Sequence, residues 1–449
     1  MVLPEAFITR TKDLLCDEWS DFEKALNEES PVSIRINPRK ANPDILKDIL
    51  SLSEPINWTK EGYYLNNRPS FTLDPLFHAG CYYVQEASSM ILEYFVINYF
   101  PKPAKVLDLC AAPGGKSTHL SSLLPEESLL VANETVRSRA GILSENLIKW
   151  GNPNTIVTQN DPADIGKSLP LFFDVIVADL PCSGEGMFRK NPSSIAEWSL
   201  NNVKHCAERQ RRIVIDIWKA LKPGGIFIYS TCTCNREENE ENLEWICKNL
   251  NAELLQEPLR MMPHKVKGEG FFIAGMMKRG EGNRVKSNSS QVAERSRSIT
   301  RHASTSLSNL SPVTRHLSPP TNFTYTTNNS KWIAIPKIHF ADYLCIKKYL
   351  RVLNAGVTLG ETKGQDLIPS HELAMSNSLS KTVFPVFEVD KETALNYLRK
   401  DSLQIIPNEL LKGFILITYK HIPLGFIKNI GTRINNLYPQ EWRIRKKNF

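Results

Sequence analysis

Two cysteines stand where apolar segments end, and their surroundings suggest a chemical role. Cys182 lies in DLPCSGEG (179–186), directly after FDVIVA, and Cys232 lies in YSTCTC (229–234), at the end of GIFIYS. Each apolar run has the length and composition of a buried strand, so each thiol stands at the start of a polar loop. A thiol in such a place can attack a substrate, assist another nucleophile or simply fill space.

The middle of the chain alternates strand and helix patterns, which determines where these thiols lie. The candidate strands are 105–109, 128–133, 154–158, 174–179 and 225–230, with a further pair at 253–258 and 270–279. The candidate helices are 116–124, 136–150 and about 196–221. This alternation predicts an α/β fold, a Rossmann-like parallel sheet covered on both faces, with its binding site beyond the carboxyl ends of the strands. Cys182 and Cys232, on neighbouring strand ends, should lie side by side.

A small-residue turn between the first strand and its helix predicts a cofactor loop. The turn has few bulky side chains, so a ligand can approach the backbone, and the helix after it offers free amide donors. It matches neither the dinucleotide nor the triphosphate glycine pattern. Glu134 follows the second strand, where an acid can bind a ribose diol, and Asp161 follows the third, where an acid can accept from an adenine amino group. We expect a nucleoside cofactor across these three strand ends. The loop residues are Cys110, Ala111, Ala112, Pro113, Gly114 and Gly115.

Thiols beside a nucleoside cofactor indicate covalent methyl transfer to a pyrimidine. C5 of a pyrimidine is a poor nucleophile until a thiolate adds to C6, after which C5 can attack an electrophilic methyl group. An acid at N3 must neutralise the charge that develops, and Asp179 is placed for this if it is protonated or shares a proton. A second thiol can assist elimination of the adduct. Spacing alone does not rank Cys182 and Cys232 as attacker and helper.

Two other interpretations give cysteines a role outside catalysis, as metal ligands or as packed side chains. A zinc site can be imagined from Cys182, Cys232 and Cys234, but the chain has no paired C-x₂-C knuckles and no nearby histidine, so no metal is expected. Cys16, Cys206 and Cys247 are expected to be small packed side chains.

The ordered motifs resemble the Sun/nucleolar-protein family of RNA (cytosine-5) methyltransferases, which use S-adenosylmethionine. The matching segments are SIRINP (33–38), QEASSM (85–90), LCAAPGGKS (109–117), NE (133–134), ND (160–161), DLPCSGEG and YSTCT. The resemblance implies that Cys232 is the nucleophile and that Cys182 aids product release. It also implies that Lys116 and Arg139 line the cofactor pocket, and that Glu134, Asp161 and Asp179 contact the cofactor or the target base. Cys234 departs from the pattern; on a continuing strand it would share a face with Cys232.

Outside the core, the sequence divides into segments with expected roles in RNA binding. We expect an N-terminal RNA-binding segment (1–100), a methyltransferase domain (101–280), a disordered Ser/Arg/Pro-rich linker (281–321) and a basic mixed α/β domain (322–449). The ending GTRINNLYPQEWRIRKKNF, with GEGFFIAGMMKR before the linker, is similar to the bacterial RsmF-type subgroup, which acts on 16S rRNA and ends in a PUA-like domain.

The residues expected to contact RNA come from both ends of the chain. In RINPRK, Arg35, Asn37 and Arg39 are candidates, mainly through the family pattern. In the C-terminal segment Tyr438 and Trp442 could stack on unpaired bases, although core packing is at least as expected for Trp442. Phosphate contacts are expected from Arg433, Arg443, Arg445, Lys446 and Lys447.

Charge and composition favour an RNA partner inside the cell. The net charge of +7 is uneven: −5 over residues 1–280, +4 over 281–320 and +8 over 321–449. The basic C-terminal part suits a nucleic acid, although a merely solvated basic surface would have the same composition. The resemblance implies that the partner is rRNA, free or in the assembled small subunit. With no apolar run of about 18 residues, no signal sequence and an odd number of cysteines, we expect a cytoplasmic protein, a monomer, without membrane contact.

Three other functions are alternatives to cytosine-5 methylation of rRNA. Methylation of a base amino group needs no thiol, and the paired cysteines argue against it. A tRNA cytosine-5 methyltransferase would use the same chemistry on another RNA. A catalytically silent RNA-binding factor for ribosome assembly is disfavoured by the presence of Cys232, Cys182 and Asp179 together.

Overall fold

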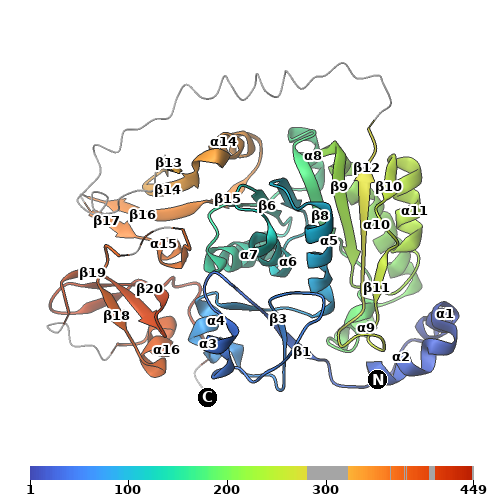
Figure 1. Cartoon of the computed structure of the whole chain (residues 1–449), viewed down its shortest axis with the longest axis horizontal. Helices are drawn as coiled ribbons and strands as arrows, with labels where there is room; N and C mark the ends of the chain where they lie inside the picture. Colours follow the sequence, from blue (N-terminus) through green and yellow to red (C-terminus); the bar gives the residue numbers. More distant parts are fainter. Residues whose placement is uncertain (281–321, 365, 379, 381, 404–409, 447–449) are drawn as a thin grey trace.

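The chain folds around one large mixed sheet with smaller sheets beside it (Figure 1). The computed structural model describes residues 1–280, 322–364, 366–378, 380, 382–403 and 410–446. The linker predicted at 281–321 and Lys447 lie outside the described residues. Within the described parts, no helix combines the length and apolar character needed to cross a membrane.

The central sheet has the order β10-β12-β9-β8-β5-β6-β7-β15, with β11 paired to β12. Strands β5 to β9 run parallel, and β12 is antiparallel to β9. The Rossmann-like α/β fold predicted from the sequence is confirmed. The strands are β5 (Lys105–Asp108), β6 (Leu129–Asn133), β7 (Thr155–Thr158), β8 (Phe173–Asp179), β9 (Leu221–Thr231), β10 (Ala252–Leu254), β11 (Leu259–Met261), β12 (Phe271–Lys278) and β15 (Val352–Ala355).

Alternate residues of these strands face two separate apolar cores, because successive side chains of a strand point to opposite faces. On one face Leu107 and Ile176 pack with α8 (Pro162–Ser168), α10 (Leu200–Trp218), α11 (Glu240–Asn249) and α14 (Phe340–Tyr349). On the other, Val106 and Val177 pack with α5 (Leu92–Tyr99) and α6 (Gly115–Leu123). Helix α7 (Arg137–Trp150) covers Ala132 and Val157 through Leu143 and Leu147. Both faces of the sheet are covered, so its open edge for binding is the row of strand ends.

The N-terminal segment forms a small antiparallel sheet and a helical pair. The sheet has the order β2-β3-β1-β4. Helix α5, inside the predicted 1–100 segment, packs against the central sheet instead. The elements are α1 (Glu5–Leu15), α2 (Trp19–Leu26), β1 (Val32–Ile36), α3 (Pro43–Lys47), β2 (Leu52–Pro55), β3 (Gly62–Leu65), α4 (Pro75–His78) and β4 (Tyr82–Val84).

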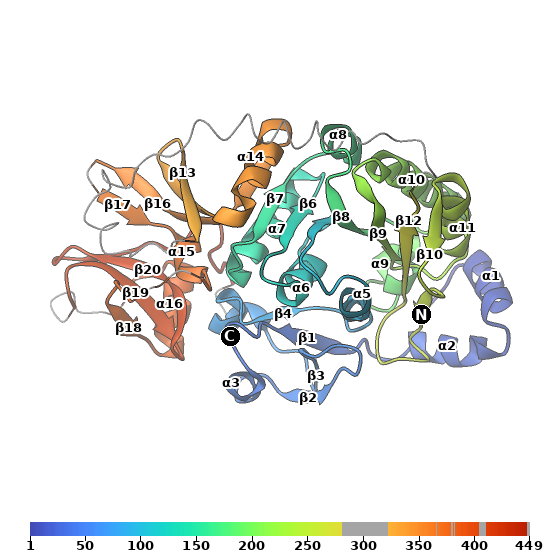
Figure 2. The same ribbon diagram turned by 45° about the horizontal axis from the view of Figure 1, so that its top comes forward.

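The C-terminal part contains two four-stranded sheets, where the sequence suggested one compact domain (Figure 2). Its strand β15 also joins the central sheet, pairing antiparallel with β7, so it covers an edge whose backbone groups would otherwise need another partner. The elements are β13 (Phe323–Asn328), β14 (Lys331–Pro336), β16 (Val357–Lys363), β17 (Asp366–Pro369), α15 (His371–Met375), β18 (Val386–Glu388), α16 (Lys391–Arg399), β19 (Gly413–Tyr419), β20 (Ile422–Asn429) and β21 (Ile434–Asn436).

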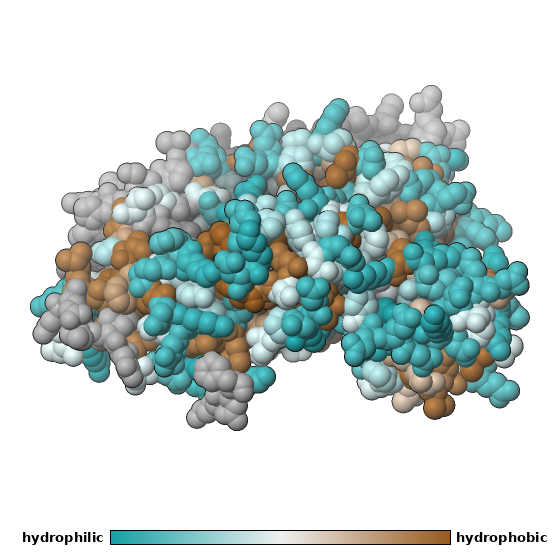
Figure 3. Space-filling model, turned by 60° about the horizontal axis from the view of Figure 1, so that its bottom comes forward, coloured by the Kyte–Doolittle hydropathy of each residue, from teal (hydrophilic) through white to brown (hydrophobic). Residues whose placement is uncertain are grey.

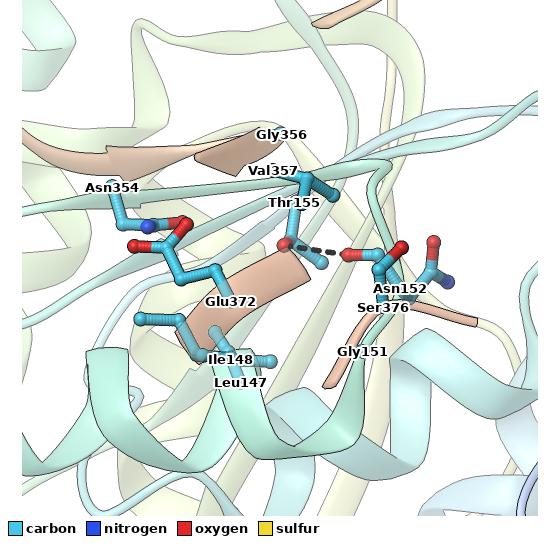
Figure 4. Close-up of a pocket in the computed structure, with 10 residues that line it drawn as sticks. All are labelled: Leu147, Ile148, Gly151, Asn152, Thr155, Asn354, Gly356, Val357, Glu372 and Ser376. Carbon is cyan, nitrogen blue, oxygen red and sulfur yellow. Dashed lines mark hydrogen bonds between the residues drawn. The ribbon is translucent and has the colours of Figure 1, made fainter. Parts of the chain in front are cut away.

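A small cavity of about 10 Å³ lies where α7, β7 and β15 meet α15 (Figure 4). Glu372 and Asn354 lie on one side of it, and the Thr155 hydroxyl donates to the carbonyl of Asn152 on the other. Glu372 also accepts from the amide of Thr358 at 2.8 Å. None of the predicted site residues lines this cavity, which belongs to the contact between the C-terminal part and the core.

Candidate active site

The sulfur atoms of Cys182 and Cys232 are 3.1 Å apart. Cys182 lies in the loop after β8 and Cys232 in the loop after β9, and these strands are parallel neighbours. Both residues are half-buried and both thiols are free. The pKa of the Cys182 thiol is raised, first by its hydrogen bond with Cys232 and then by burial. The two thiols therefore lie side by side, as the strand order predicted.

Asp179, the last residue of β8, is held between a cation and a hydroxyl. Lys116 Nζ lies 2.9 Å from Asp179 Oδ2, and the Ser230 hydroxyl donates to Oδ1 at 2.8 Å. Burial opposes the charge on Lys116, but the contacts with Asp179 outweigh it, so the lysine pKa is raised. The Lys116 ammonium also lies 4.9 Å from the centre of the Phe271 ring. The acid and the cation are thus fixed at the same strand ends as the thiols.

The loop between β5 and α6 has the geometry of a ligand cradle. Gly114 precedes α6 with φ +115°, a conformation that L side chains rarely adopt, and a Cβ there would also meet Leu143 and Asn146 at 3.4 Å. Arg139 donates to the carbonyl of Ala112 at 2.7 Å, and Asn146 donates to that of Pro113 at 2.8 Å. Helix α7 therefore holds the loop carbonyls and leaves the first amides of α6 for a ligand.

Three acids surround this loop at the strand ends. Asp108 is fully buried; Ser117 donates to its Oδ2 at 2.6 Å, while Oδ1 has no hydrogen-bond partner. Burial raises the pKa of Asp108 to about 7. Glu134 is buried, accepts from the amide of Val136 and lies 3.4 Å from Arg139, whereas Asp161 is exposed at the start of α8. Buried oxygens with spare capacity beside a glycine cradle fit a polar ligand such as a nucleoside cofactor.

Comparisons with known proteins agree with this geometry. The family model "16S rRNA methyltransferase RsmB/F" matches residues 100–277, the N-terminal domain model of 16S rRNA methyltransferase RsmF matches 3–87, and the RsmF PUA domain model matches 384–444. Over its methyltransferase core the chain is similar to the RsmB/F methyltransferase family. Two of these models are specific to RsmF, and together the three span both ends of the chain.

Individual relatives support the same family over most of the length. Ribosomal RNA small subunit methyltransferase F of Pectobacterium atrosepticum is 35% identical over 307 residues, which cover 62% of this chain and 63% of the relative. The protein of that name from Escherichia coli (strain K12) is 29% identical over 478 residues, covering 98% of this chain and 96% of the relative.

Solved structures with the same fold have sequence identities to this chain that are close to those of these relatives. The crystal structure of PH0851 is 27% identical with a TM-score of 0.56, covering 62% of this chain and 66% of that one. A methyltransferase homolog protein from Pyrococcus horikoshii is 29% identical with a TM-score of 0.54, covering 61% of this chain and 95% of that one.

The predicted RNA contacts of Arg35 and Asn37, in the RsmF-type N-terminal domain, are wrong. Arg35 is 1% exposed, and its guanidinium donates to Gln85 at 2.9 Å and to Thr118 at 2.6 Å and lies 4.5 Å from the Trp150 ring centre. Asn37 is fully buried and donates to the carbonyls of Gly80 and Trp150. Both side chains connect β1 to the methyltransferase core. Arg39, beside them, is exposed.

Among the predicted C-terminal RNA contacts, the charged residues are exposed to solvent, whereas the aromatic residues are largely buried. Arg433, Arg443, Arg445 and Lys446 are exposed. Tyr438 is 1% exposed, so the prediction that it stacks on a base is wrong. Trp442 is half-buried and packs at 5.1 Å against His371, as the core-packing alternative predicted. Hydrophilic side chains also cover much of the face that Figure 3 shows.

Cys234 does not share a face with Cys232. Strand β9 ends at Thr231, and Cys234 is 2% exposed in an apolar cluster with Phe7, Phe188 and Trp198. Burial raises its pKa to about 12. The described residues contain no group of three or more side chains that could hold a metal ion. Cys234 is therefore a packed side chain.

Sequence reasoning missed two buried acids in the loops that carry the thiols. Glu185, in the loop after β8, is 2% exposed, and Glu238, after β9, is fully buried. Each accepts hydrogen bonds from the opposite loop. The available signal was an acid next to small residues in PCSGEG and a run of acids in NREENEEN, but an acid after a strand is usually solvated.

Proposed function

We propose that this protein transfers a methyl group from S-adenosylmethionine to C5 of a cytidine in small-subunit ribosomal RNA, through a covalent bond between Cys232 and C6. The observation that carries the proposal is the pair of thiols 3.1 Å apart, beside the Lys116–Asp179 ion pair, at the carboxyl edge of the sheet. Relatives that are named ribosomal RNA small subunit methyltransferase F, and align over 98% of the chain, support 16S rRNA as the substrate.

The cofactor would lie on the loop from Cys110 to Lys116, where S-adenosylmethionine supplies an electrophilic methyl group. The first amides of α6 and the cradle at Gly114 would receive its amino-acid part, Glu134 would bind its ribose hydroxyls and Asp161 would accept from its adenine amino group. Arg139 has a supporting role, since it holds the carbonyl of Ala112 and lies 3.4 Å from Glu134.

The chain's own residues then perform the covalent steps. The Cys232 sulfur adds to C6, and the electrons of the C5–C6 double bond make C5 a nucleophile that takes the methyl group. Asp179, held by Lys116 and Ser230, carries a proton or shares one with Lys116 and donates it to N3, which neutralises the charge that develops on the ring as the adduct forms; the proton returns when the adduct is resolved. In the last step a base removes the C5 proton, the double bond re-forms and the C6–S bond breaks.

Cys182 is suited to that last step because of how its pKa is raised. The largest cause is its hydrogen bond with Cys232. Once the Cys232 sulfur is bonded to carbon it is a neutral thioether, and this cause is lost. The Cys182 thiol then gives up its proton more readily, so more of it is present as the thiolate that can accept the C5 proton at the stage where the adduct must be resolved.

The nucleophile can be tested directly. Cys232→Ala should abolish methyl transfer from labelled S-adenosylmethionine to small-subunit rRNA and retain cofactor binding, measured by calorimetry. The matched control is Cys16→Ala, because Cys16 is an exposed cysteine of the same chain and should be dispensable. Full activity in Cys232→Ala would refute the assignment.

The substrate needs a separate test, since a tRNA cytosine-5 methyltransferase would use the same residues. Bisulfite sequencing of ribosomal and transfer RNA from cells with and without the gene should show one or more cytidines of 16S rRNA losing methylation. Loss in tRNA alone would favour that alternative, and no loss in either would favour a silent assembly factor. An rRNA substrate implies action in the cytoplasm, on free RNA or on the assembled subunit.

A further inference from the structure

The loops that carry the two thiols are joined directly to each other. The loop after β8 (180–186) is called the β8 loop here, and the loop after β9 (232–239) the β9 loop. The amide of Gly186 donates to the carbonyl of Cys232 at 2.9 Å. The hydroxyls of Ser183 and Thr233, each one residue beyond a thiol, are 3.0 Å apart. The relative position of the two sulfurs therefore depends on contacts between the loops.

Glu238 of the β9 loop accepts from the β8 loop. The amide of Ser183 donates to its Oε2 at 3.0 Å, Gln210 of α10 donates to the same oxygen at 2.8 Å, and Asn235 donates to Oε1 at 2.8 Å. Glu238 is fully buried, and burial raises its pKa. A buried carboxylate held by neutral donors is costly, so its presence indicates that its contacts are needed.

Glu185 makes the reciprocal contact from the β8 loop. Its Oε2 accepts from the Thr233 hydroxyl at 2.8 Å and from the amide of Cys234 at 3.0 Å, and its Oε1 accepts from the indole of Trp198 at 3.0 Å. Each loop thus places one buried carboxylate on backbone or hydroxyl donors of the other. A carboxylate suits both positions because it only accepts, and a glutamine would turn an NH₂ group toward a donor.

We infer that Glu238 and Glu185 are positioning residues, which hold the Cys182 sulfur against the Cys232 sulfur by accepting hydrogen bonds across the two loops. The inference rests on the proposed function for its catalytic consequence, because release of the product needs both thiols at one base. Its geometric part concerns the position of the Cys182 sulfur relative to the Cys232 sulfur, which can be probed without any turnover.

The geometric test is the rate at which diamide joins the two thiols. Diamide takes two electrons and two protons from Cys182 and Cys232 and is reduced to the hydrazine, leaving one sulfur–sulfur bond. Intact mass and peptide mapping identify that bond among the other cysteines. Because disulfide formation requires narrow geometry, Glu238→Gln should form it at least about fivefold more slowly than the wild type. Glu244→Gln, an exposed acid of α11, is the matched control and should react like the wild type.

The catalytic test uses the same variants. With Glu238→Gln, kcat for methyl transfer should fall about ten- to a hundredfold, the covalent RNA adduct should accumulate, and KM for S-adenosylmethionine should stay within about twofold. A merely structural role would change all of these together with the melting temperature. Thr233→Val, which keeps the shape and removes the hydroxyl bound to Glu185, should act in the same direction and serves if Glu238→Gln does not fold.

The outcomes separate the inference from the proposed function. Disulfide rates and kcat equal to those of Glu244→Gln, in an active wild type, would overturn the positioning role and leave the methyltransferase proposal standing. A wild type that methylates no cytidine, with a slower disulfide in Glu238→Gln, would overturn the proposed function and support the positioning role.

Discussion

Polar groups are buried both at the strand ends of the central sheet and in strand β1 of the N-terminal sheet, but the two regions differ in how these groups are hydrogen-bonded. At the strand ends, Asp108 accepts one hydrogen bond and keeps one buried oxygen unbonded. In β1, Arg35 donates to Gln85, Thr118 and the carbonyl of Gly115 and lies against Trp150. The first region leaves an acceptor oxygen free for a ligand, whereas Arg35 uses its Nε and Nη2 donors to join two parts of the fold and only its Nη1 has no hydrogen-bond partner.

This difference predicts opposite responses to mutation. Removing a polar group from the strand ends should impair chemistry and cost little stability, or even increase it, because such groups are placed for a ligand. Removing one from β1 should lower stability without a direct effect on RNA contacts, because its partners are all within the protein. Four substitutions test this contrast.

The largest effect is expected for Cys182→Ala. Without the helper thiol the adduct between Cys232 and RNA should persist, so turnover should fall by about a hundredfold or more, in the range of a lost general acid–base group. A slowly migrating RNA–protein band on a denaturing gel reports the adduct, and thermal melting should show a change of about 1 kcal/mol or less. A normal turnover without that band would remove the helper role, and Cys16→Ala again provides the control.

Asp108→Asn should stabilise the protein at high pH. Burial raises the pKa of Asp108 to about 7 in the folded state, against 3.8 for the unperturbed group. Between these values the unfolded chain has lost a proton that the folded chain retains, so stability falls as pH rises through this window, by up to about 4 kcal/mol above pH 7. The variant avoids this loss, and its advantage should shrink as pH approaches 4.

Urea unfolding from pH 4 to pH 8 measures the effect of Asp108→Asn. Asp164→Asn, an exposed acid of α8, is the control and should show little change at any pH. An Asp108→Asn variant that is less stable than the wild type at pH 8 would mean that the Asp108 carboxylate is stabilised by contacts within the protein, as the polar groups of β1 are.

Arg35→Met should act in the opposite direction and lower stability by about 3 kcal/mol, because Gln85 and Thr118 lose a buried, charged donor. Urea unfolding measures the loss, and the salt dependence of RNA binding by the folded variant should match the wild type. Arg39→Met, an exposed neighbour, should leave stability nearly unchanged. If Arg35→Met were stable and bound RNA more weakly, Arg35 would be an RNA ligand after all.

The same contrast explains what the sequence could predict. The strand predicted at 174–179 is β8 (Phe173–Asp179), and that at 270–279 is β12 (Phe271–Lys278), because apolar runs in a sheet that is covered on both faces are strong local signals. Chain order then put Cys182 and Cys232 at neighbouring strand ends, whereas the 3.1 Å separation of their sulfurs also depends on the contacts between the two loops.

The errors arose where the partner of a side chain lies far away in the chain. Arg35 reads as a basic residue in a loop-like motif, and only the packing of β1 on α6 and Trp150 shows that it is buried. Tyr438 is buried by Tyr397 and His371, which precede it by dozens of residues. Glu185 and Glu238 were missed for the same reason, since no local pattern reveals that an acid will meet donors of another loop.

The smallest effect is expected for Arg445→Ala, which carries the contrast to the C-terminal surface. Arg445 is exposed, so its loss should leave the melting temperature unchanged. If it contacts an RNA phosphate, affinity should fall by about 1 kcal/mol, and the slope of log K against log salt should become shallower by about 0.7. Arg445→Lys keeps the charge and should keep the slope. An unchanged slope in Arg445→Ala would mean that this exposed arginine is as uninvolved in binding RNA as the buried Arg35, and that the basic surplus of residues 321–449 acts through other positions.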